Sequence, residues 1–261
     1  MKILVTGANG FIGRHCCALL KSQGHDVVAL TSTEIDITKP FTLKGHFNAV
    51  LHLAAYNITS VGDKNEDAYA RVNVQGTNHV LEAVSCDQFI LLSTAKICSR
   101  DQSGYTQSKV AAEEMCQTHF KGKSLIIVRS VNILGKGQAP KAVLPIFIDK
   151  ANANQPLELT VHPLNPISFI DVRDVAALIC AIVRRSDVSG TYNAAYPSYI
   201  TLQDLALKVI AACHSSSKIR NMSLPIAPIG NPKKLDCQKT WEDFKYQPQF
   251  GIDQILENIL L

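Results

Sequence analysis

Long apolar runs are missing from this chain of 261 residues, although 46% of its residues are hydrophobic. The longest unbroken run extends from Val175 to Val183, lies between two charged residues and is far too short to span a bilayer. The first apolar run begins directly after Lys2, which leaves no room for a charged leader and a cleavage site. We therefore expect no membrane segment and no secretory signal.

Runs of like charge are missing as well. Only 18% of the residues are charged, the formal net charge is +4, and Lys and Arg do not gather in any stretch. Proteins that bind nucleic acids usually carry a basic stripe or patch. The composition is that of an ordinary globular protein, and no nucleic-acid partner is expected.

Clusters of metal ligands are also absent. The eight cysteines never form a Cys-x-x-Cys pair, and no Cys and His residues lie together at the short spacing of a zinc site. We expect no metal and interpret most cysteines as small buried residues in a reducing compartment, which places the protein in the cytoplasm. The cysteines are Cys16, Cys17, Cys86, Cys98, Cys116, Cys180, Cys213 and Cys237.

Short apolar strands alternate with longer amphipathic helices in the sequence. Apolar runs without polar alternation are typical of strands buried on both faces, and helices between them indicate parallel pairing. The pattern predicts an α/β fold, a Rossmann-type doubly wound parallel sheet with a small C-terminal substrate lobe. The predicted strands are 2–6, 26–30, 49–53, 89–92, 125–129 and 191–194, and the predicted helices are 11–22, 66–84, 105–119, 142–153, 171–184 and 201–212.

A glycine-rich turn, Thr-Gly-Ala-Asn-Gly-Phe-Ile-Gly, occupies residues 6–13 between the first strand and the first helix. Its first glycine permits a tight turn, the second lets the backbone approach a pyrophosphate, and the third lets the helix pack on the strand. The helix N-terminus adds N–H groups and the positive end of its dipole. The turn predicts a dinucleotide site. Its predicted members are Gly7, Asn9, Gly10, Phe11, Ile12 and Gly13.

Proline marks a change of character after the fifth strand. Prolines at 140, 145, 156, 163 and 166 predict mostly loops over 135–168, and prolines at 225, 228, 232 and 248 predict a loop-rich tail. We assign residues 1–134 and 168–195 to an NAD(P)-binding domain. Residues 135–167 and 196–261 are assigned to the substrate-binding lobe, over the carboxyl edge of the sheet where such folds bind ligands.

The glycine turn and three later segments resemble the extended short-chain dehydrogenase/reductase family. These segments are Leu-His-Leu-Ala-Ala at 51–55, Arg-Val-Asn-Val-Gln-Gly-Thr at 71–77 and Phe-Ile-Asp-Val-Arg-Asp-Val at 169–175. Residues 33–37 and 54–56 are similar to the dehydrorhamnose-type sugar reductases of this family. The resemblance implies a nucleotide-sugar epimerase, dehydratase or reductase that binds NAD(P). It implies cofactor contacts from Leu53, Ala54, Ala55 and Asn73, and adenine contacts from Asp36 and Ile37.

The end of the second predicted strand bears on the choice of cofactor. An NAD-type site places an acid near this position to bind the ribose hydroxyls, whereas here the strand is followed by Thr31, Ser32 and Thr33. Hydroxyl groups at Thr31 and Ser32 could bind a 2′-phosphate, although no arginine stands beside them. We expect NADP(H) or NAD(H), and these hydroxyls favour NADP(H).

Tyr105 and Lys109 are spaced so that they lie on one face of a predicted helix, one turn apart. A nearby ammonium group lowers the pKa of a phenol, and such a tyrosine can exchange a proton with a sugar hydroxyl or carbonyl. The resemblance implies that these two residues and Thr94 form the catalytic set, with Lys109 also holding the nicotinamide ribose. Ser93 is the alternative to Thr94 as the catalytic hydroxyl and is also expected to contact the substrate. Asn132 is expected beside the substrate.

Two departures from the family pattern affect the prediction of function. Only a short loop separates Thr94 from Tyr105, with Cys98 at a usual tyrosine position, and no arginine occurs at 165–168. The short loop favours a reductase of a keto-sugar, and the family implies a sugar linked to a nucleotide, whereas the missing arginine argues against the nucleotide. An epimerase or dehydratase would use the same residues, and a dinucleotide-binding regulator without catalysis is a further alternative. The family also implies a homodimer formed through helices 66–84 and 105–119.

Overall fold

The computed structural model describes residues 1–57, 65–99, 101–121, 123–222 and 235–261. It divides into two compact units, and each is described by itself. The predicted loop around prolines 225, 228 and 232 lies outside the described residues. Among the described helices, none combines the length and the apolar composition that a membrane span requires. Unit 1 comprises Met1–Ser130, Ala176–Ala194 and Cys237–Tyr246, and unit 2 comprises Val131–Val175, Ala195–Asp236 and Gln247–Leu261.

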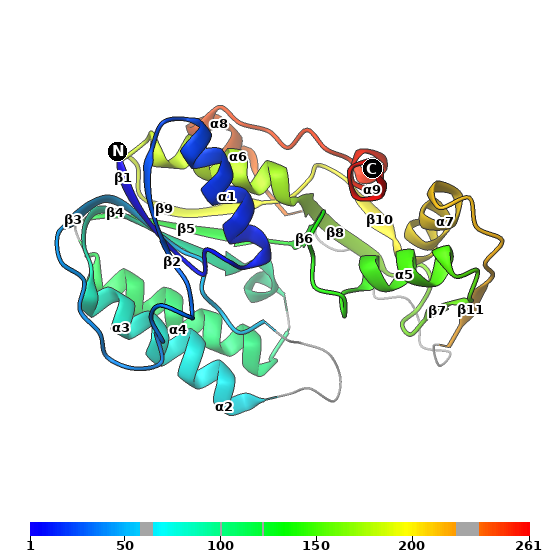
Figure 1. Ribbon diagram of the computed structural model, residues 1–261, viewed down its shortest axis with the longest axis horizontal. Coiled ribbons are helices and arrows are strands. Elements are labelled where there is room, and N and C mark those ends of the chain that lie inside the picture. Colours follow the sequence, from blue (N-terminus) through cyan, green and yellow to red (C-terminus); the bar gives the residue numbers. More distant parts are fainter. Residues whose placement is uncertain (58–64, 100, 122, 223–234) are drawn as a thin grey trace. The chain divides into compact units, whose positions relative to one another are not determined.

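Unit 1 contains a six-stranded sheet in the order β2-β1-β3-β4-β5-β9 (Figure 1). All its strand pairings are parallel, so the predicted doubly wound sheet is confirmed. The strands are β1 (Lys2–Thr6), β2 (Asp26–Leu30), β3 (His46–His52), β4 (Ser85–Thr94), β5 (Ser124–Ser130) and β9 (Gly190–Ala194). The helices are α1 (Phe11–Ser22), α2 (Glu66–Ala68), α3 (Gly76–Ala83), α4 (Gly104–His119) and α8 (Gln238–Phe244), joined by α6 (Val172–Val183), which begins in unit 2.

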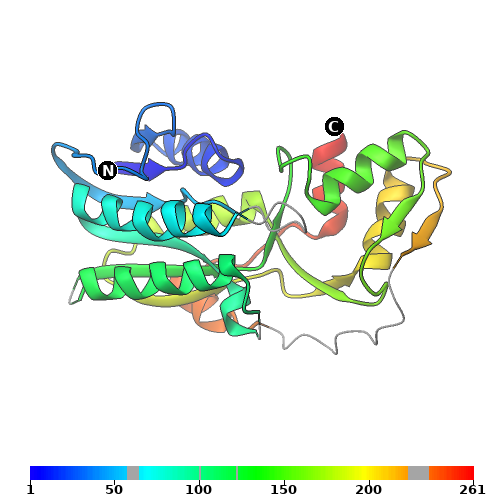
Figure 2. The same ribbon diagram turned by 90° about the horizontal axis from the view of Figure 1, so that it is seen from below.

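Helices cover both faces of this sheet, which explains why its strands are apolar throughout. Figure 1 shows α1, α6 and α8 on one face and α3 and α4 on the other, and Figure 2 looks onto α3 and α4 lying side by side. Beneath α3 and α4, the strand residues Leu4, Phe89 and Leu91 pack with Val80 and Ala112, and all five side chains are buried. Burying side chains of this size removes most of their apolar surface from water and stabilises the sheet.

The helix predicted over 66–84 is interrupted by a π-helical segment, Tyr69–Gln75. The helical region starts earlier, with α2, whose N-cap is Asn65: the side chain of Asn65 accepts a hydrogen bond from the amide of Ala68. Hydrophobic periodicity does not reveal such a segment, because the pattern is read with the α-helical period throughout. Its consequence is that Asn73, which is 1% exposed, points into the interior of unit 1.

Unit 2 contains more regular structure than the prolines indicated. The predicted loop over 135–168 holds short strands, and the predicted loop-rich tail holds α9 and, in unit 1, α8. Three-residue strands are too short to show alternation, and they form because they pair with one another and cover a shared core. The elements of unit 2 are β6 (Asn132–Leu134), α5 (Val143–Asn152), β7 (Leu157–Leu159), β8 (Pro166–Asp171), β10 (Tyr199–Thr201), α7 (Leu202–Ala212), β11 (Ile219–Asn221) and α9 (Ile252–Leu260).

The boundaries of the two units differ from the predicted domains at four places, residues 131–134, 168–175, 195 and 237–246. Residues 168–175 belong to unit 2, because β8 pairs there with β6 and β10. Residues 237–246 belong to unit 1, because α8 packs on β9: the Tyr192 hydroxyl donates to Asp243 Oδ2 at 2.9 Å, and the Thr240 hydroxyl donates to the carbonyl of Asn193 at 2.7 Å. The ring of Phe244 meets that of Tyr192 edge to face. These contacts join residues that are far apart in sequence, so the local sequence pattern does not predict them.

The contact between α8 and β9 gives a test of this assignment. Tyr192→Phe removes the hydroxyl that bonds Asp243, and we expect the free energy of unfolding to fall by about 1 kcal/mol. Urea denaturation measures the change. Tyr199→Phe, which alters a tyrosine that is 48% exposed, serves as the matched control and should leave the midpoint unchanged. Equal midpoints for wild type and Tyr192→Phe would contradict the packing of α8 described here.

Candidate functional site

The glycine-rich turn has the geometry of a phosphate cradle. Gly7 adopts φ +68°, and a Cβ at this position would lie 2.7 Å from the amide nitrogen of Ala54. A Cβ on Gly13 would collide with the carbonyl oxygen of Gly7. Any side chain at either position would therefore block the close approach of the turn to the end of β3 and to α1.

The N-terminus of α1 is left open for an anion. Gly10 is its N-cap, provides no side chain, and the first turn carries no acidic residue. The first N–H groups of a helix have no partner within the helix and commonly bind phosphate. Asn9 is exposed, whereas Phe11 and Ile12 are half-buried at the start of the helix. The residues present thus fit the pyrophosphate of a dinucleotide.

The other predicted cofactor residues lie at the carboxyl ends of neighbouring strands in unit 1. Thr6, the last residue of β1, pairs with Leu30 of β2 on one side and with His52 of β3 on the other. The amide of Ala8 donates to the carbonyl of Leu30, which ties the glycine turn to the end of β2. Open α/β sheets bind ligands at this edge. The predicted residues that follow these strands are Thr31, Ser32, Asp36 and Ile37 after β2, and Leu53, Ala54 and Ala55 after β3.

A buried chain of hydrogen bonds connects these strand ends to α3. The Ala54 amide donates to Thr6 Oγ1 at 3.3 Å, and Thr6 Oγ1 lies 2.7 Å from His52 Nδ1. His52 Nε2 lies 3.0 Å from Thr77 Oγ1, which donates to the carbonyl of Asn73 at 2.7 Å. Thr6, His52, Thr77 and Asn73 are all at most 2% exposed.

The direction of this chain follows from the number of protons. The Thr77 hydroxyl has one hydrogen, which it gives to the carbonyl of Asn73, so it must accept from His52 Nε2. Neutral His52 then has no hydrogen on Nδ1, and Nδ1 accepts from the Thr6 hydroxyl. Burial, together with nearby Lys109, lowers the pKa of His52 to about 3, which agrees with a neutral ring. Sequence reasoning assigned His52 no role; the register of β1 and β3 is what reveals it.

Asn73 extends the network to the helix that carries the predicted catalytic residues. Its side chain accepts from the Tyr56 amide at 2.7 Å and donates to the Tyr56 carbonyl at 3.0 Å. It also donates to Ser108 Oγ at 2.9 Å, and the Ser108 hydroxyl donates to the carbonyl of Tyr105 at 2.7 Å. Asn73 therefore positions the chain after β3 and the first turn of α4.

Tyr105 and Lys109 lie one turn apart in α4, as their spacing predicts. Lys109 is 4% exposed, and no group among the described residues forms a hydrogen bond or ion pair with its ammonium. Burial lowers the pKa of Lys109 to about 8. The phenol of Tyr105 likewise has no hydrogen-bond partner within the described part of the chain, although the ring of Tyr69 lies 6.1 Å from its own ring.

The pKa of Tyr105 differs from the sequence-based expectation. We expected Lys109 to lower it, but burial, with a smaller effect of Tyr69, raises the pKa of Tyr105 to about 12. The reason is that a phenolate would lose its hydration in this position. Tyr105 is therefore protonated at neutral pH, the form that donates a proton.

Ser93 and Thr94 end β4, the strand that α4 packs against. Thr94 caps the following short turn, Ala95–Cys98, by accepting from the Lys96 amide at 3.3 Å, which leaves its own hydrogen free to donate. Ser93 is 5% exposed, and its Oγ has no hydrogen-bond partner. A buried hydroxyl without a partner is unusual and requires an explanation, for which a bound ligand is one candidate.

The remaining predicted substrate residue, Asn132, lies in unit 2. It is exposed, and its side-chain amide donates to the carbonyl of Ser168 at 2.9 Å, which joins β6 to β8. In unit 1, Arg129 forms a bidentate ion pair with the buried Glu113, and its guanidinium also donates to Cys98 Sγ at 3.8 Å. This ion pair fixes β5 to α4, and the sequence pattern does not indicate it.

The sequence of residues 3–195 matches the model of the NAD dependent epimerase/dehydratase family. The chain belongs to this family. Two relatives are each 25% identical: dTDP-D-glucose 4,6-dehydratase of Dictyostelium discoideum, over 80% of this chain, and dTDP-4-dehydro-6-deoxy-D-allose reductase of Streptomyces bikiniensis, over 95% of this chain and 91% of the reductase. The match covers only 61% of the length of the dehydratase.

Solved structures of the epimerase/dehydratase fold superpose over nearly the whole chain. UDP-glucuronic acid 4-epimerase from Bacillus cereus, in complex with UDP-glucuronic acid and NAD, has a TM-score of 0.83 at 22% identity, covering 99% of this chain and 98% of its own. RMD from Pseudomonas aeruginosa, complexed with NADPH, has a TM-score of 0.87 at 19% identity, covering 99% and 97%. At these identities the likeness confirms the fold alone.

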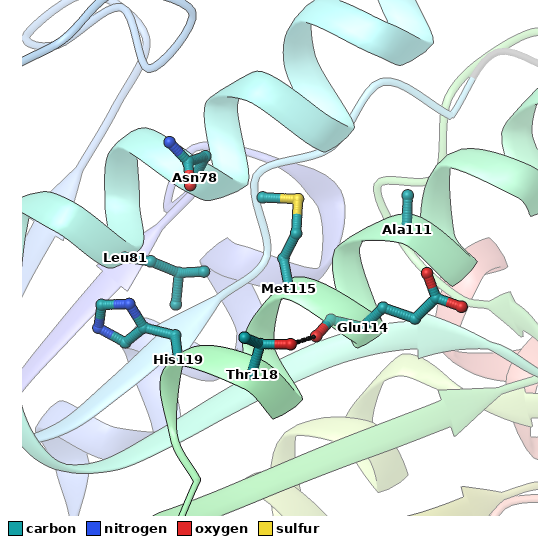
Figure 3. A pocket seen from close by; sticks show the side chains of 7 residues that line it. All are labelled: Asn78, Leu81, Ala111, Glu114, Met115, Thr118 and His119. Atoms are coloured by element: carbon teal, nitrogen blue, oxygen red, sulfur yellow. Dashed lines mark hydrogen bonds between the residues drawn. The ribbon is translucent and has the colours of Figure 1, made fainter.

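Unit 1 also contains a pocket that does not include the predicted cofactor or catalytic residues. It is formed by the outer faces of α3 and α4, and none of the candidate cofactor or catalytic residues lines it (Figure 3). No group of three potential metal ligands among His, Cys, Asp and Glu occurs in the part of the chain that the structure describes. The pocket is lined by Asn78, Leu81, Ala111, Glu114, Met115, Thr118 and His119.

The pH dependence of stability tests whether His52 is neutral in the buried hydrogen-bond chain. In the folded state His52 stays unprotonated down to about pH 3, whereas in the unfolded state it takes up a proton below about pH 6.5. Acid therefore favours unfolding, and between pH 7 and pH 5 this residue should cost about 2 kcal/mol of stability. In His52→Gln the amide can replace both hydrogen bonds but does not titrate. Urea denaturation at the two pH values should show a smaller acid loss for His52→Gln than for wild type; equal losses would contradict the assignment.

Proposed function

We propose that this family member is an NAD(P)-dependent reductase that acts on a keto group of a sugar, linked to a nucleotide. The observation that carries the proposal is the set of polar groups in unit 1 without partners: the Tyr105 phenol, the Lys109 ammonium and the Ser93 hydroxyl. Ser93 and Lys109 are buried and Tyr105 is half-buried, and removing polar groups from water without partners destabilises a fold, so they indicate a site that a ligand completes.

Each group has a role in this proposal. When bound, the nicotinamide supplies or accepts a hydride. Tyr105 donates a proton to the oxygen of the keto group, and the Thr94 hydroxyl, whose hydrogen is free, forms a hydrogen bond with the same oxygen. Lys109 provides a buried positive charge that stabilises the developing phenolate and holds the ribose hydroxyls. Ser93 contacts the sugar.

The protonated state of Tyr105 is the one that reduction requires in its first chemical step. A reductase needs a proton donor at the start, whereas an epimerase begins by removing a proton from a sugar hydroxyl. The raised pKa of Tyr105 suits the donor. An epimerase or dehydratase using the same residues is the alternative, because both reactions are found among the relatives.

The test measures loss of reduced-nicotinamide absorbance with a panel of nucleotide-linked 4-keto sugars. We expect Tyr105→Phe to lower kcat by about 100-fold or more, with the cofactor Kd unchanged. Tyr192→Phe, which removes a buried hydroxyl elsewhere in unit 1, is the control and should retain activity. Conversion of sugar isomers without net cofactor consumption would instead establish the epimerase, and near-normal turnover of Tyr105→Phe would refute the assigned role.

We further propose a cytoplasmic homodimer. All eight cysteines are free, which suits a reducing compartment. The outer faces of α3 and α4 present the pocket of Figure 3, whose half-buried apolar members Ala111 and Met115 would be covered by a second copy. Analytical ultracentrifugation should detect a dimer for the wild type and a monomer for Ala111→Arg, because an arginine would place a charge in that contact. A monomeric wild type would contradict the proposal.

A further inference from the structure

Lys96 is held beside the hydroxyl that is proposed to bind the keto oxygen. It lies in the short turn Ala95–Cys98, which directly follows Thr94 at the end of β4. The amide of Lys96 donates to Thr94 Oγ1 at 3.3 Å, and the carbonyl of Lys96 accepts from the amide and the hydroxyl of Ser99, at 2.9 Å and 2.6 Å. These bonds fix the backbone from which the Lys96 side chain extends.

The side chain of Lys96 reaches the ring of Tyr105. Its Nζ lies over this ring, 6.0 Å from the ring centre. A cation at about this distance is attracted by the negative face of an aromatic ring. The ring of Tyr69, from the π-helical segment, lies 6.1 Å from that of Tyr105. Lys96 and Tyr69 thus contact Tyr105 from two elements other than its own helix and restrict the orientation of its ring.

Asp101 orients the ammonium of Lys96. Asp101 Oδ2 lies 3.8 Å from Lys96 Nζ, and Asp101 Oδ1 accepts from the amide of Ser103 at 2.8 Å. Ser103 in turn caps α4 by accepting from the amide of Thr106 at 3.3 Å. The same carboxylate therefore contacts Lys96 and the cap of the helix that carries Tyr105. With side chains 45% and 26% exposed, such a pair contributes little to stability, so its effect is on the position of Lys96.

Proton donation by Tyr105 leaves a negative charge in a place with little hydration. Burial, with a smaller effect of Tyr69, raises the pKa of Tyr105 to about 12, so its proton is lost with difficulty. Lys109, one turn along α4, carries only a partial charge near pH 8, because burial lowers its pKa to about 8. Lys96 offers a second cation, with its side chain partly in water. A positive charge at this distance attracts a phenolate, and partial exposure weakens the attraction without cancelling it.

We propose that Lys96 is a positioning residue for proton transfer by Tyr105: its ammonium holds the ring in place and stabilises the phenolate that proton donation leaves. The inference rests on the proposed function and extends it. In that reaction the O–H bond of Tyr105 breaks and the proton goes to the keto oxygen, while the keto carbon takes the hydride of the reduced nicotinamide. The sugar thereby gains a hydroxyl group, and the phenolate regains its proton from water before the next turnover.

The experiment measures kcat and KM of the full chain with the 4-keto sugar of the panel that the wild type reduces fastest. Lys96→Met removes the charge and keeps most of the side chain, and we expect kcat to fall about tenfold while KM and the cofactor Kd stay within about twofold of wild type. Lys96→Arg supplies another cation and should return kcat to within about threefold of wild type. Lys208→Met is the matched control: the Lys208 side chain is 42% exposed and pairs with Asp253, and its loss should leave kcat unchanged.

A double variant separates this role from a purely structural one. In the Tyr105→Phe background Lys96→Met should have no further effect on kcat, because no phenolate forms there. An unchanged kcat, a rise in KM alone, equal losses for Lys96→Met and Lys96→Arg, or a loss that persists in the Tyr105→Phe background would overturn the role of Lys96 and leave the proposed function intact. A wild type that turns over no sugar of the panel would overturn the proposed function itself.

Discussion

The parallel register of β1 with its two neighbours is the constraint on which the candidate site depends. Thr6 pairs with Leu30 on one side and with His52 on the other, so β1, β2 and β3 end at the same edge. The glycine turn, the residues after β2 and the residues after β3 therefore lie at one edge of the sheet, although they are separated in sequence. A shift of register would move each side chain to the opposite face of the sheet and separate these groups.

The buried hydrogen-bond chain extends this constraint from the backbone to side chains. A neutral His52 accepts from Thr6 and donates to Thr77, and a protonated ring could not keep both bonds in the same direction. Asn73, at the end of the chain, is held in the interior by the π-helical segment and bonds both Tyr56 and Ser108. The position of the α4 turn that carries Tyr105 is thereby linked to the end of β1 through groups that water does not reach.

The sequence predicts those parts of the fold that depend on local patterns. Apolar runs predict the central strands, and the spacing of glycines predicts the turn before α1, because a Cβ at Gly7 or Gly13 is sterically excluded. The short strands of unit 2 and the packing of α8 on β9 are not predicted, since their stability comes from distant partners such as Tyr192 and Asp243. The same limit applies to cofactor choice. The sequence shows Thr31 and Ser32 as free hydroxyls, and only the folded turn reveals that Thr31 donates to Glu34.

Two buried charged groups that α4 carries in unit 1, Glu113 and Lys109, differ in whether a partner compensates for their burial. Arg129 and Glu113, although largely removed from water, satisfy one another and fix β5 to α4, so their bond serves the fold. Lys109 is equally buried, but no partner among the described residues compensates for its lost hydration, and its pKa falls to about 8. A fold selected only for stability would replace such a lysine with an apolar residue of similar size. Its retention beside Tyr105 on the helix that the buried network positions is what a site for a charged or polar ligand requires.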